Sequence, residues 1–212
     1  MYTPPAFVVD DTSEIHAMMR ACRIANFITA TAQGPLATPL PMLLDAEEGE
    51  MGMLYAHLAR PNPQWQTPMI GDGLAVFMGP DAYITPAWYA AKAEHGKVVP
   101  TWNYTAVQAK GPVEFFDDPA RLLDVVKRLT DLHEAAAAKP WAVSDAPAAY
   151  ITAQLRGIVG IRMSITHLTG KRKLSQNRPE PDRMGVRNGL SESHRDFDRV
   201  IADMIPVPSS SS

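Results

Sequence analysis

The sequence has almost no cysteine, and this scarcity excludes several kinds of site. Cys22 is the single cysteine among 212 residues, so an internal disulfide and any multi-cysteine zinc or iron–sulfur site are excluded. Long apolar runs are also missing, because no stretch approaches the ~20 residues of a membrane-spanning helix. Residues 1–8 lack the basic and apolar pattern of a signal peptide. We therefore expect a cytoplasmic protein that does not associate with membranes.

The chain also has no large excess of positive or negative charge. The chain carries 20 Lys and Arg residues against 23 Asp and Glu residues, a formal net charge of −3. Such a balance does not attract nucleic acid to the molecule as a whole. Hydrophobic residues make up 46% of the sequence, which is typical of a globular protein with a buried core. Proline is abundant instead, with 19 residues, and its fixed φ angle predicts several stiff loops.

Several motifs of catalysis and nucleotide binding are missing. No Gly-x-Gly-x-x-Gly follows a predicted strand, and there is no P-loop, no His-Glu-x-x-His zinc motif and no Gly-x-Ser-x-Gly elbow. A helix-turn-helix with a basic second helix is not evident either. From the residues we therefore assign no catalytic residue and no metal ligand.

The apolar periodicity predicts strands first and helices later. A helix over 11–25 precedes a meander of three strands over 27–32, 36–44 and 51–57. Further strands are predicted over 74–78, 82–84, 98–116 and 158–167, and further helices over 118–138, 145–157 and 191–204. This order indicates an α+β protein whose six short strands close into a small barrel. We expect one domain over 1–204, including a basic segment over 168–190, and a disordered tail over 205–212.

Three loops place a tryptophan two residues after a proline, at Trp65, Trp88 and Trp102. Because proline stiffens the backbone, each indole is held in a fixed position, where its face and its N–H suit a flat ligand. Alternatively, these side chains plug the ends of the barrel or a dimer interface, and the residues alone leave both interpretations open.

Two polar segments are candidates for anion binding. Arg60 and Asn62 directly follow a predicted strand, where a guanidinium can bind a phosphate and an amide can donate to it. Residues 170–189 carry six basic residues against two acidic ones, a local charge of +4, and Ser175, Gln176 and Asn177 add hydrogen-bonding groups. In the alternative interpretation, Arg60 is solvated beside a turn, and the basic segment is a solvated tail or contacts nucleic acid.

Long stretches of the chain resemble the FMN-binding negative transcriptional regulator family of PaiB-like proteins. They occur in the family's order from residue 1 to about residue 204. The main ones are Met1–Phe7, His57–Trp65, Gly79–Tyr89, Lys97–Tyr104, Ser144–Pro147, Ile158–Gly160 and Lys173–Arg178.

The resemblance implies a fold, a cofactor and a set of binding residues. The implied fold is a six-stranded antiparallel split β-barrel similar to pyridoxamine-phosphate oxidase, with flanking helices, as a homodimer with FMN at its interface. Arg60 and Asn62 then meet the flavin phosphate, and Trp88 or Trp102 covers the ring. The other implied flavin contacts come from neighbouring strands and from the C-terminal segment: Thr29, Thr31, Thr38, Lys173, Ser175, Gln176 and Asn177.

The chain departs from the family at three positions. Pro39, Asp81 and Gln108 stand where the family carries histidine, which argues against metal or haem ligation and acid–base chemistry there. The alternatives to a flavin-binding regulator are a flavin-dependent oxidoreductase of a small substrate and a haem protein that uses His57 or His167. Direct DNA binding would depend on the basic segment alone.

Overall fold

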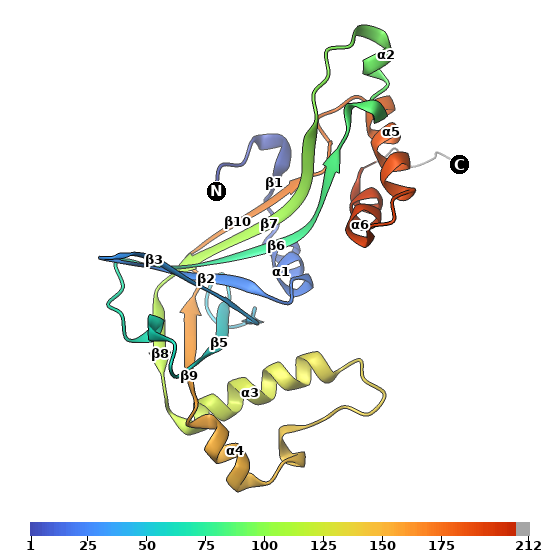
Figure 1. Ribbon diagram of the computed structural model, residues 1–212. Coiled ribbons are helices and arrows are strands. Elements are labelled where there is room, and N and C mark those ends of the chain that lie inside the picture. The colour runs from blue at the N-terminus through green and yellow to red at the C-terminus, as the bar shows by residue number, and fades with distance from the viewer. Residues whose placement is uncertain (207–212) are drawn as a thin grey trace. The chain divides into compact units, whose positions relative to one another are not determined.

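A computed structural model describes residues 1–206, and its strands form two sheets (Figure 1). The larger sheet has six strands in the order β1-β10-β7-β6-β2-β3, and the smaller sheet has four in the order β4-β5-β9-β8. The strands of the larger sheet are β1 (Val8–Val9), β2 (Ala25–Thr31), β3 (Gly34–Leu40), β6 (Gly73–Ile84), β7 (Thr101–Gly111) and β10 (His167–Lys173). Those of the smaller sheet are β4 (Leu43–Asp45), β5 (Met53–Ala59), β8 (Val113–Phe116) and β9 (Ile158–Ser164). The predicted α+β class with a six-stranded antiparallel sheet is confirmed.

The helices lie before, between and after the strands. They are α1 (Thr12–Ala21), α2 (Ala91–His95), α3 (Pro119–Glu134), α4 (Ala148–Leu155), α5 (Glu180–Ser191) and α6 (Asp196–Met204). Short 3₁₀ turns are η1 (Pro5–Phe7), η2 (Pro63–Trp65), η3 (Pro86–Trp88) and η4 (Val143–Asp145). None of the helices within residues 1–206 combines the length and the apolar character that crossing a bilayer requires.

Contacts divide the chain into two compact units. The first unit combines Met1–Met18, Met78–Val107 and the described part of Thr169–Ser212, and the second combines Met19–Phe77 and Gln108–Leu168. The prediction of a single folding domain stays a prediction, because contact density does not measure whether a unit folds alone.

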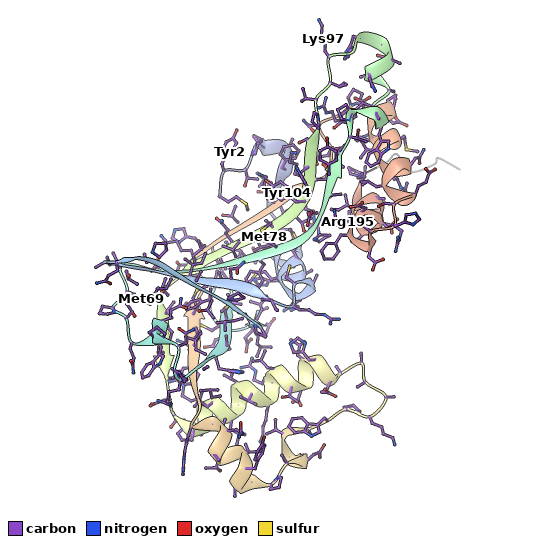
Figure 2. All side chains as sticks on the ribbon, in the orientation of Figure 1. Tyr2, Met69, Met78, Lys97, Tyr104 and Arg195 are labelled. Carbon is purple, nitrogen blue, oxygen red and sulfur yellow. The ribbon has the colours of Figure 1, made fainter. Side chains whose placement is uncertain are left out.

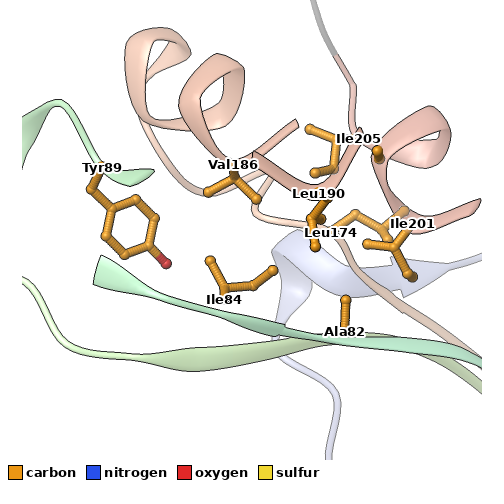
Figure 3. Close-up of a cluster of buried hydrophobic side chains, with 9 residues drawn as sticks. Ala82, Ile84, Tyr89, Leu174, Val186, Leu190, Ile201 and Ile205 are labelled. Carbon is orange, nitrogen blue, oxygen red and sulfur yellow. The ribbon is translucent and has the colours of Figure 1, made fainter. Parts of the chain in front are cut away.

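The core of the first unit lies between β6 and the two C-terminal helices (Figure 3). Ala82 and Ile84 of β6 face Val186 and Leu190 of α5. The cluster is completed by Tyr89, Leu174, Ile201, Ala202 and Ile205. Ile205, predicted to begin a disordered tail, is thus part of the core, and residues 207–212 of that tail lie outside the described residues.

The core of the second unit forms where α3 covers the smaller sheet. Asp118 begins α3 by accepting a hydrogen bond from the Arg121 N–H (2.9 Å), and Pro119 occupies the first turn. The apolar stripe of this helix then buries Leu122, Val125 and Leu129 against Leu43, Phe116 and Leu155. The capping residues were therefore enough to predict where this helix begins.

Several predicted boundaries are wrong. The strands predicted over 74–78 and 82–84 are one strand, β6, because Gly79 has no Cβ and so passes the Thr105 side chain without a clash. The first helix ends at Ala21, since β2 already begins at Ala25. The basic segment contains β10 and α5, which its polar composition did not indicate, and the last helix begins at Asp196.

Candidate functional site

Thr29, Thr38 and Asn62 meet around the side chain of Gln64 in the second unit. Gln64 is 1% exposed; its Nε2 donates to Thr29 Oγ1 (3.1 Å), and its Oε1 accepts from Thr38 Oγ1 (2.5 Å). Asn62 Nδ2 donates to Thr38 Oγ1 (3.0 Å), and Asn62 Oδ1 accepts from the Gln64 N–H (2.9 Å) at the start of η2. The strands β2 and β3 and the turn after β5 therefore share one polar network. Sequence reasoning missed Gln64, whose only local signal is its place between Pro63 and Trp65.

Thr31 lies outside this network. Its hydroxyl donates to the Gly34 carbonyl (2.7 Å) in the turn between β2 and β3. The local role of Thr31 is therefore to close this hairpin, and its assignment to the flavin stays a prediction.

The Arg60 guanidinium is held in one orientation at the end of β5. Its Nε donates to the Arg156 carbonyl (2.7 Å), and Nη2 donates to the Ile158 carbonyl (3.1 Å). Nη1 lies 3.5 Å from the exposed Asp117 carboxylate. The guanidinium carbon lies over the Trp65 ring, 5.7 Å from its centroid, and Trp65 Nε1 donates to the Arg60 carbonyl (2.9 Å). The charge is therefore positioned by the backbone and remains partly exposed.

His57 lies on β5, opposite Gly160 of β9. Its Nδ1 is buried and has no hydrogen-bond partner within the described part of the chain. Burial lowers the pKa of His57 below its ordinary value, because an apolar surrounding disfavours the charged ring. His57 also lines a cavity of about 360 Å³ together with His133 and Trp141. The ring is therefore neutral at pH 7 and unable to act as a cation for an anionic ligand.

The tryptophans Trp88 and Trp102 have different surroundings in the first unit. Trp88 packs so closely on α5 that a Cβ at Gly185 or Gly189 would overlap its carbonyl or its ring. Trp102 is 48% exposed and meets Tyr83 edge to face, with ring centroids 5.7 Å apart. Of the two predicted ring contacts, only Trp102 presents a large open surface.

The C-terminal residues gather beside Trp102 in the same unit. Lys173 Nζ donates to Thr101 Oγ1 (2.5 Å) and to the Trp102 carbonyl. Ser175 exchanges hydrogen bonds with the buried amide of Asn103, at 3.0 and 3.2 Å. Lys173, Ser175, Asn177 and Arg178 are among the residues that line a cavity of about 60 Å³.

The Gln176 side chain holds the backbone of its own segment by hydrogen bonds. Its Oε1 accepts from the Leu174 N–H (2.6 Å), and its Nε2 donates to the Arg172 carbonyl (2.5 Å). Both ends of the amide therefore hold the backbone, and a flavin contact of Gln176 stays a prediction.

The structure thus brings most of the predicted binding residues into two groups, one in each unit. Thr29, Thr38 and Asn62 share the Gln64 network, whereas Trp102, Lys173 and Ser175 belong to the C-terminal group. Within residues 1–206, no three His, Cys, Asp or Glu side chains are grouped so that they could hold a metal ion.

Comparison with known proteins identifies the family. The family model described as "Putative FMN-binding domain" matches residues 1–167. The chain belongs to this family. The matched residues contain the whole Gln64 network and Arg60, and the match ends before Lys173.

Curated relatives extend the likeness over almost the whole chain. The protease synthase and sporulation protein PAI 2 of Bacillus subtilis is 29% identical over 206 residues, covering 97% of this chain and 96% of that protein. An uncharacterized protein of Emericella nidulans is 32% identical over 217 residues, covering 85% of this chain and 86% of the relative. The predicted resemblance to PaiB-like proteins is therefore confirmed.

Solved structures share the fold at low sequence identity. The flavocytochrome Anf3 of Azotobacter vinelandii matches with a TM-score of 0.55 and 15% identity, covering 78% of this chain and 68% of that one. The FAD and heme binding protein of Mycobacterium smegmatis matches with a TM-score of 0.55 and 11% identity, covering 78% and 73%. The predicted split-barrel fold is confirmed.

Proposed function

We propose that this protein binds FMN and that the flavin phosphate meets Arg60 and Asn62. Membership of the FMN-binding family supports a flavin ligand. The observation that carries the residue assignment is that both side chains are fixed by hydrogen bonds and still have N–H groups to offer.

The count of donors supports this assignment. A guanidinium has five N–H groups, and two of those of Arg60 are used by the carbonyls of Arg156 and Ile158. Two of the others are on Nη1, which lies 3.5 Å from the mostly exposed carboxylate of Asp117. Exposed ion pairs contribute at most about 1 kcal/mol, so a phosphate displaces this carboxylate at little cost. The second Nδ2 hydrogen of Asn62 is a further donor.

The family description favours FMN over FAD and haem. The solved neighbours include proteins whose names give FAD and haem as ligands, and the family description gives FMN. The absorbance spectrum of the purified protein separates flavin from haem, because haem adds a Soret band.

The binding experiment compares FMN with riboflavin, which lacks the phosphate. We expect Arg60→Ala to weaken FMN binding by about tenfold to a hundredfold, because charge-assisted hydrogen bonds contribute about 1.5–3 kcal/mol. Riboflavin binding should not change, and quenching of flavin fluorescence measures both.

The matched control is Arg156→Ala, which removes an exposed positive charge near Arg60 while keeping the backbone carbonyl that holds it. This variant should bind FMN as the wild type does. Unchanged FMN affinity in Arg60→Ala would contradict the assignment of the phosphate site.

A regulatory role is supported more strongly than metabolic turnover. The bound flavin supplies any redox chemistry, and the protein supplies its orientation and electrostatics. Identity to PAI 2 extends over nearly the full length of both chains. Pro39, Asp81 and Gln108 stand at three positions where the resemblance implies histidine, so three imidazole groups are missing there. We therefore propose a flavin-binding regulator, with a flavin-dependent oxidoreductase as the alternative.

The contacts of the basic segment argue against direct DNA binding through its first cations. Lys171 Nζ donates to the Tyr2 carbonyl (3.3 Å) and the Tyr104 hydroxyl (2.6 Å), two tyrosines labelled in Figure 2. Arg172 forms an ion pair with Glu14, and Lys173 Nζ donates a hydrogen bond to Thr101 Oγ1. Lys171 and Arg172 are engaged inside the first unit by these contacts, which favours a regulatory role through a protein partner. A gel shift at low salt tests this proposal, since phosphate contacts would produce a salt-sensitive complex.

A further inference from the structure

The cavity beside Lys173 has a size and a lining that suit a small anion. It lies within the first unit, has a volume of about 60 Å³, and is lined by Tyr89, Thr101, Asn103, Lys173, Ser175, Asn177 and Arg178. The volume is about twice the ~30 Å³ that one water occupies in the liquid. The cavity therefore admits a group of a few atoms and excludes a flavin ring.

The lysine and the arginine that line this cavity form no ion pair with a carboxylate in the described part of the chain. No Asp or Glu is among its lining residues, and within residues 1–206 no carboxylate forms an ion pair with Lys171, Lys173 or Arg178. Burial lowers the pKa of Lys173, and the charges of Lys171 and Arg178 lower it further. Like charges held together in this way are stabilised by a bound anion.

The polar groups of the cavity are held in place before any ligand arrives. Ser175 adopts a φ of 61°, in the left-handed region, and among the described residues other than glycine it is alone in having a positive φ. Such a conformation costs free energy, and it persists here with two hydrogen bonds to Asn103. Arg178 lies over the Tyr89 ring, 4.8 Å from its centroid, and the buried Tyr89 hydroxyl has no partner of good hydrogen-bond geometry in the described part of the chain.

We propose that this cavity binds a phosphoryl group, with Arg178 and Lys173 as its cations and Asn177 as a donor at its rim. A phosphoryl group fits because it carries up to two negative charges and because the planar guanidinium can bind two of its oxygens at once. The inference goes beyond the proposed function, since it does not require a flavin. The group belongs either to free phosphate or a small phosphate ester, or to the flavin itself.

The first experiment uses inorganic phosphate as the probe. A titration of the full-length protein followed by amide NMR should show saturable shifts at Thr101, Asn103 and Ser175. Arg178→Gln should weaken phosphate binding at least tenfold, and Arg178→Lys should restore part of the affinity, because it keeps the charge and loses the planar guanidinium. The control is Arg187→Gln on α5, a basic residue outside the cavity lining, which should bind as the wild type does.

Loss of folding is separated from loss of binding by a second variant. Asn177 is exposed at the rim of the cavity, so Asn177→Ala should keep the wild-type melting temperature and weaken phosphate binding. The proposal is overturned when neither variant changes the affinity for phosphate or FMN, or when wild-type protein binds neither ligand at this cavity.

The second experiment identifies the source of the phosphoryl group. If the flavin supplies it, FMN competes with phosphate, and Arg178→Gln weakens FMN but not riboflavin, while Arg60→Ala leaves FMN unchanged. If a separate phosphate supplies it, FMN leaves phosphate binding intact, and FMN affinity depends on Arg60 instead of Arg178. The two outcomes distinguish failure of the Arg60 assignment from failure of this inference.

Discussion

Gln64 is the residue on which the predicted threonines depend. Its amide joins Thr29 on β2 to Thr38 on β3, and its backbone N–H is capped by Asn62. Gln64 is buried and supplies a partner to the buried Thr29 hydroxyl, whereas the Thr38 hydroxyl is also bonded by Asn62. The geometry of the Arg60–Asn62 turn is therefore tied to one amide that does not itself need to touch a ligand.

We expect Gln64→Leu to lower the free energy of unfolding by about 1–3 kcal/mol, because it removes the amide that donates to the buried Thr29 hydroxyl. Chemical denaturation measures this change. The matched control is Gln66→Leu, at an exposed position two residues later, where the change should be small. Equal stability of the two variants would contradict the structural role assigned to Gln64.

The ionisation of His57 predicts a pH-dependent stability. Because burial lowers its pKa in the folded state below the ordinary 6.5, the unfolded chain binds more protons between the two pKa values. The buried neutral ring therefore contributes to the free energy of unfolding above pH 6.5. This contribution is lost as the pH falls from 6.5 through the lower pKa of the folded state. We expect His57→Asn to reduce the loss of unfolding free energy between pH 7.5 and pH 5. His167→Asn, at an exposed position, should leave the loss unchanged.

At the residue scale, the sequence was enough to predict three members of the polar network, but not Gln64 at its centre. The PaiB-like resemblance pointed to Thr29, Thr38 and Asn62, which the structure does bring together. Gln64 contacts Thr38 across 26 sequence positions and Thr29 across 35. A contact over such a separation has no local pattern, so only the folded chain reveals it.

At the element scale, α5 shows how packing overrides helix propensity. Each of its two glycines costs about 1 kcal/mol relative to alanine in a helix. Its charged residues are typical of an exposed loop. The helix nevertheless forms, because Gly185 and Gly189 let it lie directly on Trp88 while Val186 and Leu190 enter the core. The start of α3 was predictable because its Asp-Pro cap is local, whereas α5 depends on a contact with a distant loop.

Gly185→Ala tests this packing. The added Cβ would overlap the Trp88 carbonyl, so we expect a loss of about 1–3 kcal/mol from overpacking despite the better helix propensity of alanine. Asn188→Ala, at an exposed position of the same helix, should be neutral or slightly stabilising. Thermal unfolding followed by circular dichroism measures both, and a stabilised Gly185→Ala would show that the contact is loose.

At the scale of the whole molecule, exposed apolar side chains support the homodimer that the family resemblance implies. Met78, Tyr83, Val99 and Trp102 of the first unit are all exposed, and Met78 is labelled in Figure 2. Tyr83 and Trp102 contact each other, and adjoining exposed apolar side chains commonly mark a protein–protein interface. We propose that a second copy of the chain covers Trp102 and Tyr83.

Light scattering during size-exclusion chromatography tests this proposal. A dimer has twice the 23.2 kDa of one chain, and Trp102→Ser should raise its dissociation constant at least tenfold. Trp141→Ser, which changes a similarly exposed tryptophan of the second unit, should leave the mass unchanged. A monomeric wild-type protein would contradict the proposal.

The strand-then-helix order was enough to predict the fold class, because strand and helix periodicities are local. The assembly of each unit from separated segments was not predictable in the same way. The first unit joins three stretches of chain, and no periodicity within one stretch reports its partners in another.

The composition of the apolar cluster in Figure 3 has a consequence for biosynthesis. Ala82 and Ile84 emerge from the ribosome long before Ile201 and Ile205, which cover them in the finished protein. Until then the part of this patch that α6 covers is open to water and to chaperones, and a premature stop codon between residues 191 and 200 would leave that part exposed permanently.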